Sequence, residues 1–140
     1  MRTKGNACVA LAITLVLMTA AGCATGHSAS PVTATDLSSL AGTWQGWVRL
    51  PTGTNSPATM VMSPGGDYTV KSGAFTTQGQ AQIKDGGVVL VSTGGSGSFA
   101  TSDRASMATL ADRSDGSRIL RGTGRDDTAG PFEFEFSKTK

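Results

Sequence analysis

Short runs of alternating apolar and polar residues, separated by turn-forming residues, fill the chain from Thr43 onward. Such period-two alternation is typical of half-buried strands, and no window sustains the period of a helix. The pattern therefore predicts an all-β domain with short strands. The expected strands lie within Thr43–Leu50, Ala58–Ser63, Tyr68–Lys71, Phe75–Lys84, Val88–Ser92, Ala105–Ala111, Arg118–Gly124 and Pro131–Lys138.

The turns between these eight runs are short and rich in Gly, Pro, Asp and Asn, which favours consecutive antiparallel pairing. A meander of eight strands closes naturally into a small barrel, whose interior holds side chains or one small ligand. Closure also removes the exposed strand edges that lead to aggregation. We therefore expect a small eight-stranded antiparallel up-and-down barrel over residues 36–140, with its last strand paired to its first.

Alternation along each strand predicts which side chains fill this barrel. In the last strand, three Phe residues alternate with Glu133 and Glu135, so the Phe rings share the inner face and the carboxylates share the outer one. The expected inward set is Trp44, Val48, Leu50, Met60, Met62, Tyr68, Phe132, Phe134 and Phe136. Other strands supply Ala, Gly, Thr and Ser, so the sequence leaves open whether the interior is filled or holds a one-sided pocket.

Trp47 faces away from Trp44 by the same alternation and is the candidate partner surface of the domain. An exposed Trp on a barrel wall suggests contact with a protein partner or a membrane. The alternative is that Trp47 lies under the loop formed by residues 51–57.

Composition excludes several classes of function. The 140 residues leave room for one domain, and 12 basic against 10 acidic residues give a net charge of +2 without a polybasic block, so we expect no nucleic-acid partner. His27 is the only histidine, which argues against a metal site and against a Ser-His-Asp triad. Asp126 and Asp127 are expected in a turn, Glu133 and Glu135 on a solvated face. We therefore expect a protein without catalytic residues, metal or cofactor.

The N-terminal segment has the layout of an export signal, with Arg2 and Lys4 ahead of a short uncharged apolar run. The run ends in the sequence Ala-Ala-Gly-Cys, which resembles the lipobox of bacterial lipoproteins. The resemblance implies a signal peptide over residues 1–22, cleavage before Cys23, and a diacylglyceryl group on that cysteine. Residues 23–35 then form the lipidated cysteine and a flexible tether.

This resemblance also implies a location. Without Arg2 and Lys4, 10 basic residues balance 10 acidic ones, so attachment to the membrane comes from acyl chains rather than from charge. Ala24 follows the cysteine where an Asp would favour the inner membrane. The resemblance therefore implies a lipid-anchored envelope protein at the outer membrane, facing the periplasm.

A short helical turn over residues 37–40, capped by Asp36, leads into the sequence Gly42-Thr43-Trp44. This Gly-x-Trp entry to the first strand resembles that of lipocalins and other calycin-type barrels. The resemblance implies that Trp44 plugs the closed end of the barrel, with Arg121 or Lys138 packed across it. It also implies a small apolar or amphipathic ligand inside. The alternative is a solid core whose loops or Trp47 face bind an envelope protein.

Overall fold

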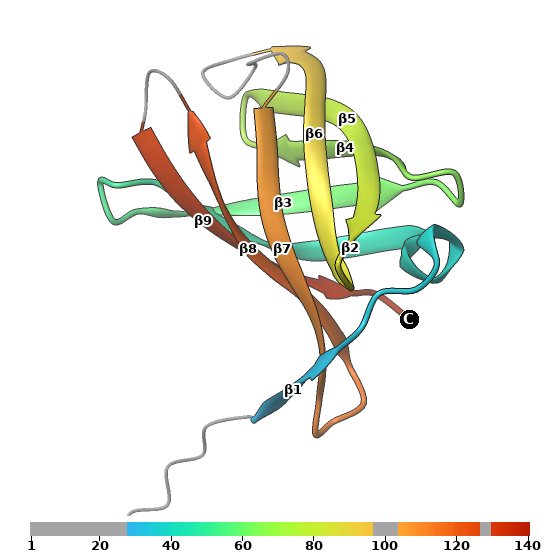
Figure 1. Ribbon diagram of the computed structural model, residues 1–140. Helices are drawn as coiled ribbons and strands as arrows, with labels where there is room; N and C mark the ends of the chain where they lie inside the picture. Colours follow the sequence, from blue (N-terminus) through green and yellow to red (C-terminus); the bar gives the residue numbers. More distant parts are fainter. Residues whose placement is uncertain (1–27, 97–103, 127–129) are drawn as a thin grey trace, which may run out of the picture.

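The computed structural model describes residues 28–96, 104–126 and 130–140, and within them it contains nine strands and one short 3₁₀ helix (Figure 1). Each of the eight expected strand ranges overlaps one of the last eight strands, so the all-β prediction is confirmed. The elements are β1 (Ala29–Val32), η1 (Leu37–Leu40), β2 (Gly42–Arg49), β3 (Asn55–Met62), β4 (Asp67–Ser72), β5 (Phe75–Lys84), β6 (Gly87–Ser96), β7 (Arg104–Arg113), β8 (Arg118–Asp126) and β9 (Gly130–Lys138).

Strands β2 to β9 form a closed antiparallel barrel. Each strand pairs with the next one along the chain, and β9 pairs back onto β2. At this seam Trp44 lies opposite Lys138, and Val48 lies opposite Phe134. The prediction of an eight-stranded up-and-down barrel closed between its first and last strands is confirmed.

The first strand of the sheet begins earlier than the sequence predicts. Strand β1 lies in the segment expected to be a tether, and it pairs with the β7 residues 110–113. Ala34 is 3% exposed, and its backbone N–H donates to the carbonyl of Gly86 at 2.8 Å. Strand β1 pairs here because β7 has an unpaired edge. Strand β6 pairs with β7 only at β7 residues 104–108, so the backbone groups farther along the same edge of β7 pair with β1. Residues 1–27, with the expected signal peptide and Cys23, lie outside the described residues.

Strand β6 continues to Ser96, beyond Ser92, where the sequence predicts that the strand ends. A shift of register beside Gln78 and Gly79 inserts a bulge, which lets the strand continue past Thr93. A Cβ at Gly95 would lie 2.1 Å from the carbonyl oxygen of Thr76, so only glycine permits this close strand approach.

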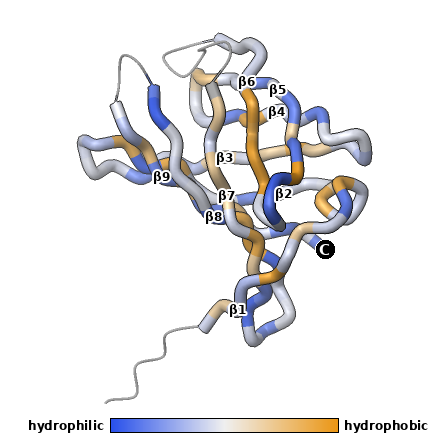
Figure 2. Tube along the Cα trace, viewed as in Figure 1, coloured by the Kyte–Doolittle hydropathy of each residue, from blue (hydrophilic) through white to orange (hydrophobic). Residues whose placement is uncertain are grey.

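The core fills the barrel toward the end where η1 sits (Figure 1). The apolar stretch of β6 stands out in Figure 2, and its Val88 is fully buried. Strands β2, β3, β7, β8 and β9 add further buried side chains to the same core. The residues that are at most 2% exposed include Leu40, Trp44, Met60, Met62, Leu110, Leu120 and Phe136. Within the described part of the chain, no helix is long and apolar enough to span a membrane.

Candidate functional site

One end of the barrel is plugged. The indole Nε1 of Trp44 donates to the carbonyl of Leu40 at 2.9 Å, and the Trp44 side chain is fully buried. Lys138 Nζ lies 5.8 Å from the centre of the Trp44 ring and donates to the carbonyl of Ser39 at 2.8 Å. Of the two basic candidates from the sequence, Lys138 lies across the plug, whereas Arg121 lies on the outer wall and pairs with Glu135. The Trp44 ring and η1 therefore cover this end of the barrel.

Asp36 holds η1 in place at its first turn. Its carboxylate accepts a hydrogen bond from the backbone N–H of Ser38 at 3.0 Å, as an N-cap does. Hydrogen bonds from the Ser38 side chain and backbone lower the pKa of Asp36. The predicted cap of the short turn is therefore present, and it fixes the plug from outside the barrel.

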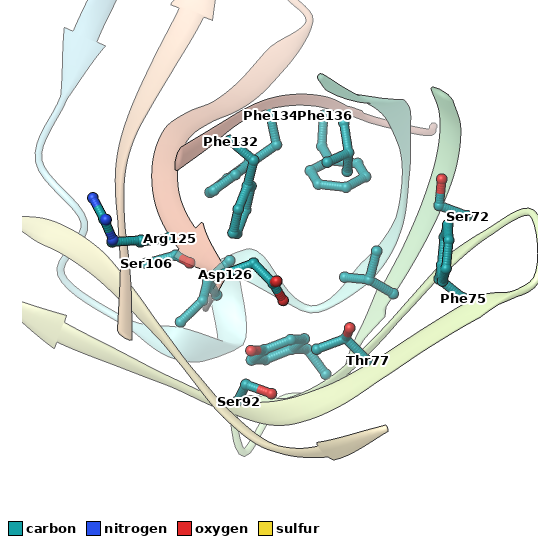
Figure 3. A pocket seen from close by; sticks show the side chains of 14 residues that line it. Ser72, Phe75, Thr77, Ser92, Ser106, Arg125, Asp126, Phe132, Phe134 and Phe136 are labelled. Atoms are coloured by element: carbon teal, nitrogen blue, oxygen red, sulfur yellow. The ribbon is translucent and has the colours of Figure 1, made fainter. Parts of the chain in front are cut away.

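A pocket of about 90 Å³ lies at the other end of the barrel (Figure 3). Its residues come from the strand ends opposite Trp44, such as the end of β4 and the start of β5. It is lined by Val48, Tyr68, Val70, Ser72, Phe75, Thr77, Leu90, Ser92, Ser106, Arg125, Asp126, Phe132, Phe134 and Phe136. The interior is therefore neither fully packed nor widely hollow: a filled core lies below a small pocket.

The predicted inward residues divide between these two regions. Val48, Tyr68 and the three Phe residues of β9 line the pocket, whereas Met60 and Met62 lie in the buried core. Phe132 is partly buried and packs against the core from the open end. Leu50 is half-buried and follows the last residue of β2, so the inward alternation ends before it.

The three Phe rings of β9 form one wall of the pocket. The ring centres of Phe132 and Phe134 are 6.3 Å apart, and those of Phe134 and Phe136 are 5.9 Å apart. Gly122 lies opposite Phe134 and Gly124 lies opposite Phe132 in the β8–β9 ladder. A Cβ at Gly124 would lie 2.3 Å from Phe132 Cζ, so the ring occupies the space that a side chain on β8 would need.

This contact predicts the effect of adding one methyl group. We expect Gly124→Ala to lower the free energy of unfolding by about 1–3 kcal/mol, because the Phe132 ring has to move. Gly65→Ala is the matched control, since a Cβ there would meet nothing closer than 3.8 Å. Urea unfolding followed by circular dichroism measures both. Equal stability of the two variants would show that Phe132 does not rest on Gly124.

The strands across from the Phe rings, β4 to β6, add hydroxyl groups among apolar side chains. Ser92 is 7% exposed, and its Oγ has no hydrogen-bond partner among the residues that the structure describes. Ser72, in contrast, donates from its Oγ to the carbonyl of Pro57 at 2.9 Å. In Figure 3 the carboxylate of Asp126 points toward the middle of the pocket, and the Arg125 side chain points away from it. The pocket thus combines aromatic and apolar side chains with the hydroxyl and carboxylate oxygens of several strands.

Sequence reasoning missed Asp126, because aspartate is common in turns and the residue was expected in one. It is instead the last residue of β8 and is 2% exposed. Alternation from the buried Leu120 through Gly122 and Gly124 places residue 126 on the inner face. The alternation of inward and outward side chains along β8 therefore predicts the position of Asp126, whereas the preference of aspartate for turns does not.

Tyr68 adds a neutral hydroxyl-bearing ring to the pocket. The residue is 6% exposed, and burial raises its pKa to about 12. A Cβ at Gly79 would lie 2.8 Å from the Tyr68 oxygen, so the tyrosine side chain extends over the glycine of β5. Below pH 10 the pocket therefore holds an uncharged phenol.

The raised pKa of Tyr68 predicts a pH dependence. Between pH 10 and about 12 the unfolded chain loses the phenol proton while the folded protein keeps it, so stability falls as pH rises through this range. We expect Tyr68→Phe to remove up to about 2 kcal/mol of that decline, since one pKa unit corresponds to about 1.4 kcal/mol. Denaturant unfolding at pH 9 and pH 11.5 measures the difference. An identical decline in both proteins would contradict the assignment.

Trp47 lies on the outer wall, as predicted, and is half-buried. The Arg49 guanidinium lies 5.5 Å from the centre of its ring, and Arg49 forms an ion pair with Glu133 across the seam. The Arg49 side chain, from the same strand, therefore covers part of the Trp47 ring. Arg49 and Glu133 lie opposite each other in the ladder between β2 and β9, so the ion pair joins the two strands that close the barrel.

The two glutamates of β9 are engaged in ion pairs rather than free in solvent. Glu135 pairs with both Arg113 and Arg121, and its side chain is only 13% exposed. The expectation of a solvated face is therefore wrong for Glu135, because two arginines from β7 and β8 converge on it. On the outer wall of β7, β8 and β9, the side chains of Arg113, Glu135 and Arg121 therefore form a connected set of charges.

The pocket residues offer two kinds of contact to a ligand. Its apolar rings can hold a hydrocarbon group, and its hydroxyl and carboxylate oxygens can hold a polar one. Among the described residues, no group of three histidine, cysteine or acidic side chains is placed to hold a metal ion. No family model, no curated protein and no solved structure matches the chain.

Proposed function

We propose that this protein is a lipid-anchored binding barrel that takes a small apolar or amphipathic ligand into the pocket at its open end. The observation that carries the proposal is a barrel plugged by Trp44 at one end, with a pocket lined by Phe rings at the other. The buried Ser92 Oγ gives further support, since an unmatched buried hydroxyl is costly and a ligand can satisfy it.

The size of the pocket limits the ligand. Typical small-molecule pockets enclose about 300–1,000 Å³, and an engineered apolar cavity of about 150 Å³ binds benzene. A pocket of about 90 Å³ holds only a few carbon atoms. The ligand is therefore a small molecule, or a longer one that inserts its end between the Phe wall and Leu90.

The Gly-x-Trp entry and its lysine support a lipocalin-like assignment for the barrel. Gly42 leads β2 into the buried Trp44, and Lys138 from β9 lies across the ring. In that family the closed end and the ligand lie at opposite ends of the barrel interior. We extend this arrangement to the present protein as part of the proposal.

The lipobox at Cys23 supports an anchor at the membrane. Strand β1 lies away from the pocket end of the barrel (Figure 1). The segment between Cys23 and Ala29 spans at most about 20 Å when fully extended. An anchored protein would therefore hold β1 near the bilayer and open its pocket toward the aqueous side, which fits exchange of a water-dispersed ligand.

The anchor is tested by moving the cysteine. Cys23→Ala should shift the protein out of the membrane fraction, because the acyl chains have no attachment site. Cys8→Ala is the matched control and should leave the protein with the membrane. If the two variants fractionate alike, the lipobox interpretation is wrong.

The binding function is tested by filling the pocket. Saturation-transfer NMR with n-butanol should detect binding to the wild type and to Val61→Trp, whose position on β3 is 52% exposed. Val70→Trp should lose most of the signal, since Val70 lines the pocket. Undiminished binding to the Val70 variant would contradict the proposed site.

A second candidate function is an interaction with an envelope protein through the outer wall. A shallow groove there includes Trp47 and Met107, and Met107 is 56% exposed. This alternative predicts that Trp47→Ala weakens capture of the partner while leaving butanol binding intact.

A further inference from the structure

We infer that the pocket selects ligands with a cationic, hydrogen-donating head group, such as a small alkylammonium ion, over anionic or neutral molecules with the same hydrocarbon part. The inference rests on the proposed function, because it names the ligand class for the same pocket. It is carried by a carboxylate, aromatic rings and a buried hydroxyl that converge on one small space.

The carboxylate belongs to Asp126. The residue is 2% exposed, lines the pocket, and points its side chain toward the middle in Figure 3. It ends β8, so the backbone of a barrel strand fixes its position. A carboxylate shielded from water attracts a cation more strongly than an exposed one, since the local dielectric constant is low.

Aromatic rings surround the same space. Phe132 and Phe134 form the wall contributed by β9, and Phe75 and Tyr68 line the pocket from β5 and β4. The faces of aromatic rings carry partial negative charge and attract ammonium groups, with a gain that grows when the cation is desolvated. A carboxylate within an aromatic pocket therefore favours an organic cation on two counts.

Hydroxyl groups supply acceptors for the remaining N–H bonds. Ser92 Oγ is buried without a hydrogen-bond partner in the described part of the chain, and Ser92 lies on the wall that faces the Phe rings. A primary ammonium group has three N–H donors, so it can serve both a carboxylate and a hydroxyl. An anionic head offers no donor to either group.

The positive charges on described side chains near the pocket point away from its middle or lie on the outer wall. Arg125 is the only basic side chain among the described pocket residues, and in Figure 3 it points away from the middle. Arg121 and Arg113 are held on the outer wall by Glu135. An anion at the mouth of the pocket can form an ion pair with Arg125, so the experiment includes a variant of that residue.

The test compares three ligands that share one hydrocarbon chain. Dissociation constants for n-butylammonium, n-butanol and butyrate are measured at pH 7 by NMR titration of the wild type. Asp126→Asn removes the charge inside the pocket, Arg125→Gln removes the cation at its mouth, and Glu133→Gln is the control for a carboxylate on the outer wall.

We expect n-butylammonium to bind at least about tenfold more tightly than butyrate, the ratio typical of one charged hydrogen bond. Asp126→Asn should weaken butylammonium by about tenfold and leave butanol unchanged, whereas Glu133→Gln should change neither. Because the ranking of ligands is measured on the wild type, the inference is tested even if the Asn variant does not fold.

The opposite results separate the two claims. If butanol binds and butyrate equals or exceeds butylammonium, the inference on charge is wrong while the pocket stands. Butyrate binding that is lost in Arg125→Gln would assign the mouth to anions instead. If none of the three ligands binds, the proposed function and the inference both fail.

Discussion

A chain that ends at Gly130 should fail to fold as a monomer. The truncation removes Phe134 and Phe136 from the interior and deletes the strand that closes the barrel between β8 and β2. Two strand edges and an apolar interior would then face water, which leads to aggregation. Size-exclusion chromatography and far-ultraviolet circular dichroism measure the outcome.

The matched control for this truncation is a chain that ends at Thr139. It loses only the exposed Lys140 and keeps the two hydrogen bonds from Thr139 to the carbonyl of Thr43, each 2.9 Å long. We expect the control to unfold cooperatively at nearly the wild-type temperature. A soluble, monomeric and cooperatively folded chain ending at Gly130 would show that closure of the barrel is not required for stability.

Trp44→Ala should lower the free energy of unfolding by about 3–5 kcal/mol, as expected for the truncation of a buried aromatic side chain. The variant leaves a cavity under η1 and removes the hydrogen bond to the carbonyl of Leu40. It also leaves Lys138 without the ring beneath it. Urea unfolding measured by circular dichroism gives the loss.

Trp47→Ala is the control for this prediction, because it removes the same side chain from the half-buried outer wall. We expect a smaller loss than for Trp44→Ala, since less apolar surface is returned to water. A loss below about 1 kcal/mol for Trp44→Ala would mean that Trp44 is not the plug of the barrel.

The strands could be predicted from the sequence because their alternation is a local property. The three Phe and two Glu residues of β9 define an inner and an outer face by themselves, and the structure keeps both. Strand β1 could not be predicted in this way. Its residues, Ala-Ser-Pro-Val, have little preference for a strand, and they pair because β7 extends beyond β6 and leaves an edge.

The candidate site was predictable only in part. The Phe wall follows from alternation, whereas the pocket depends on how rings of one strand fill the space above glycines of another. Phe132 and Phe134 lie over Gly124 and Gly122, a contact between strands that composition does not reveal. Asp126 entered the site because strand β8 continues to it, which outweighs the preference of aspartate for turns.

The central claim is that a small ligand occupies the open end of this barrel while the plugged end stays packed. Methyl NMR of the protein titrated with n-butanol is the direct test. We expect shifts for Val48, Val70 and Leu90, which line the pocket, and none for Leu110 and Leu120, which lie in the buried core. Shifts confined to the outer wall around Met107, or no shifts at all, would contradict it.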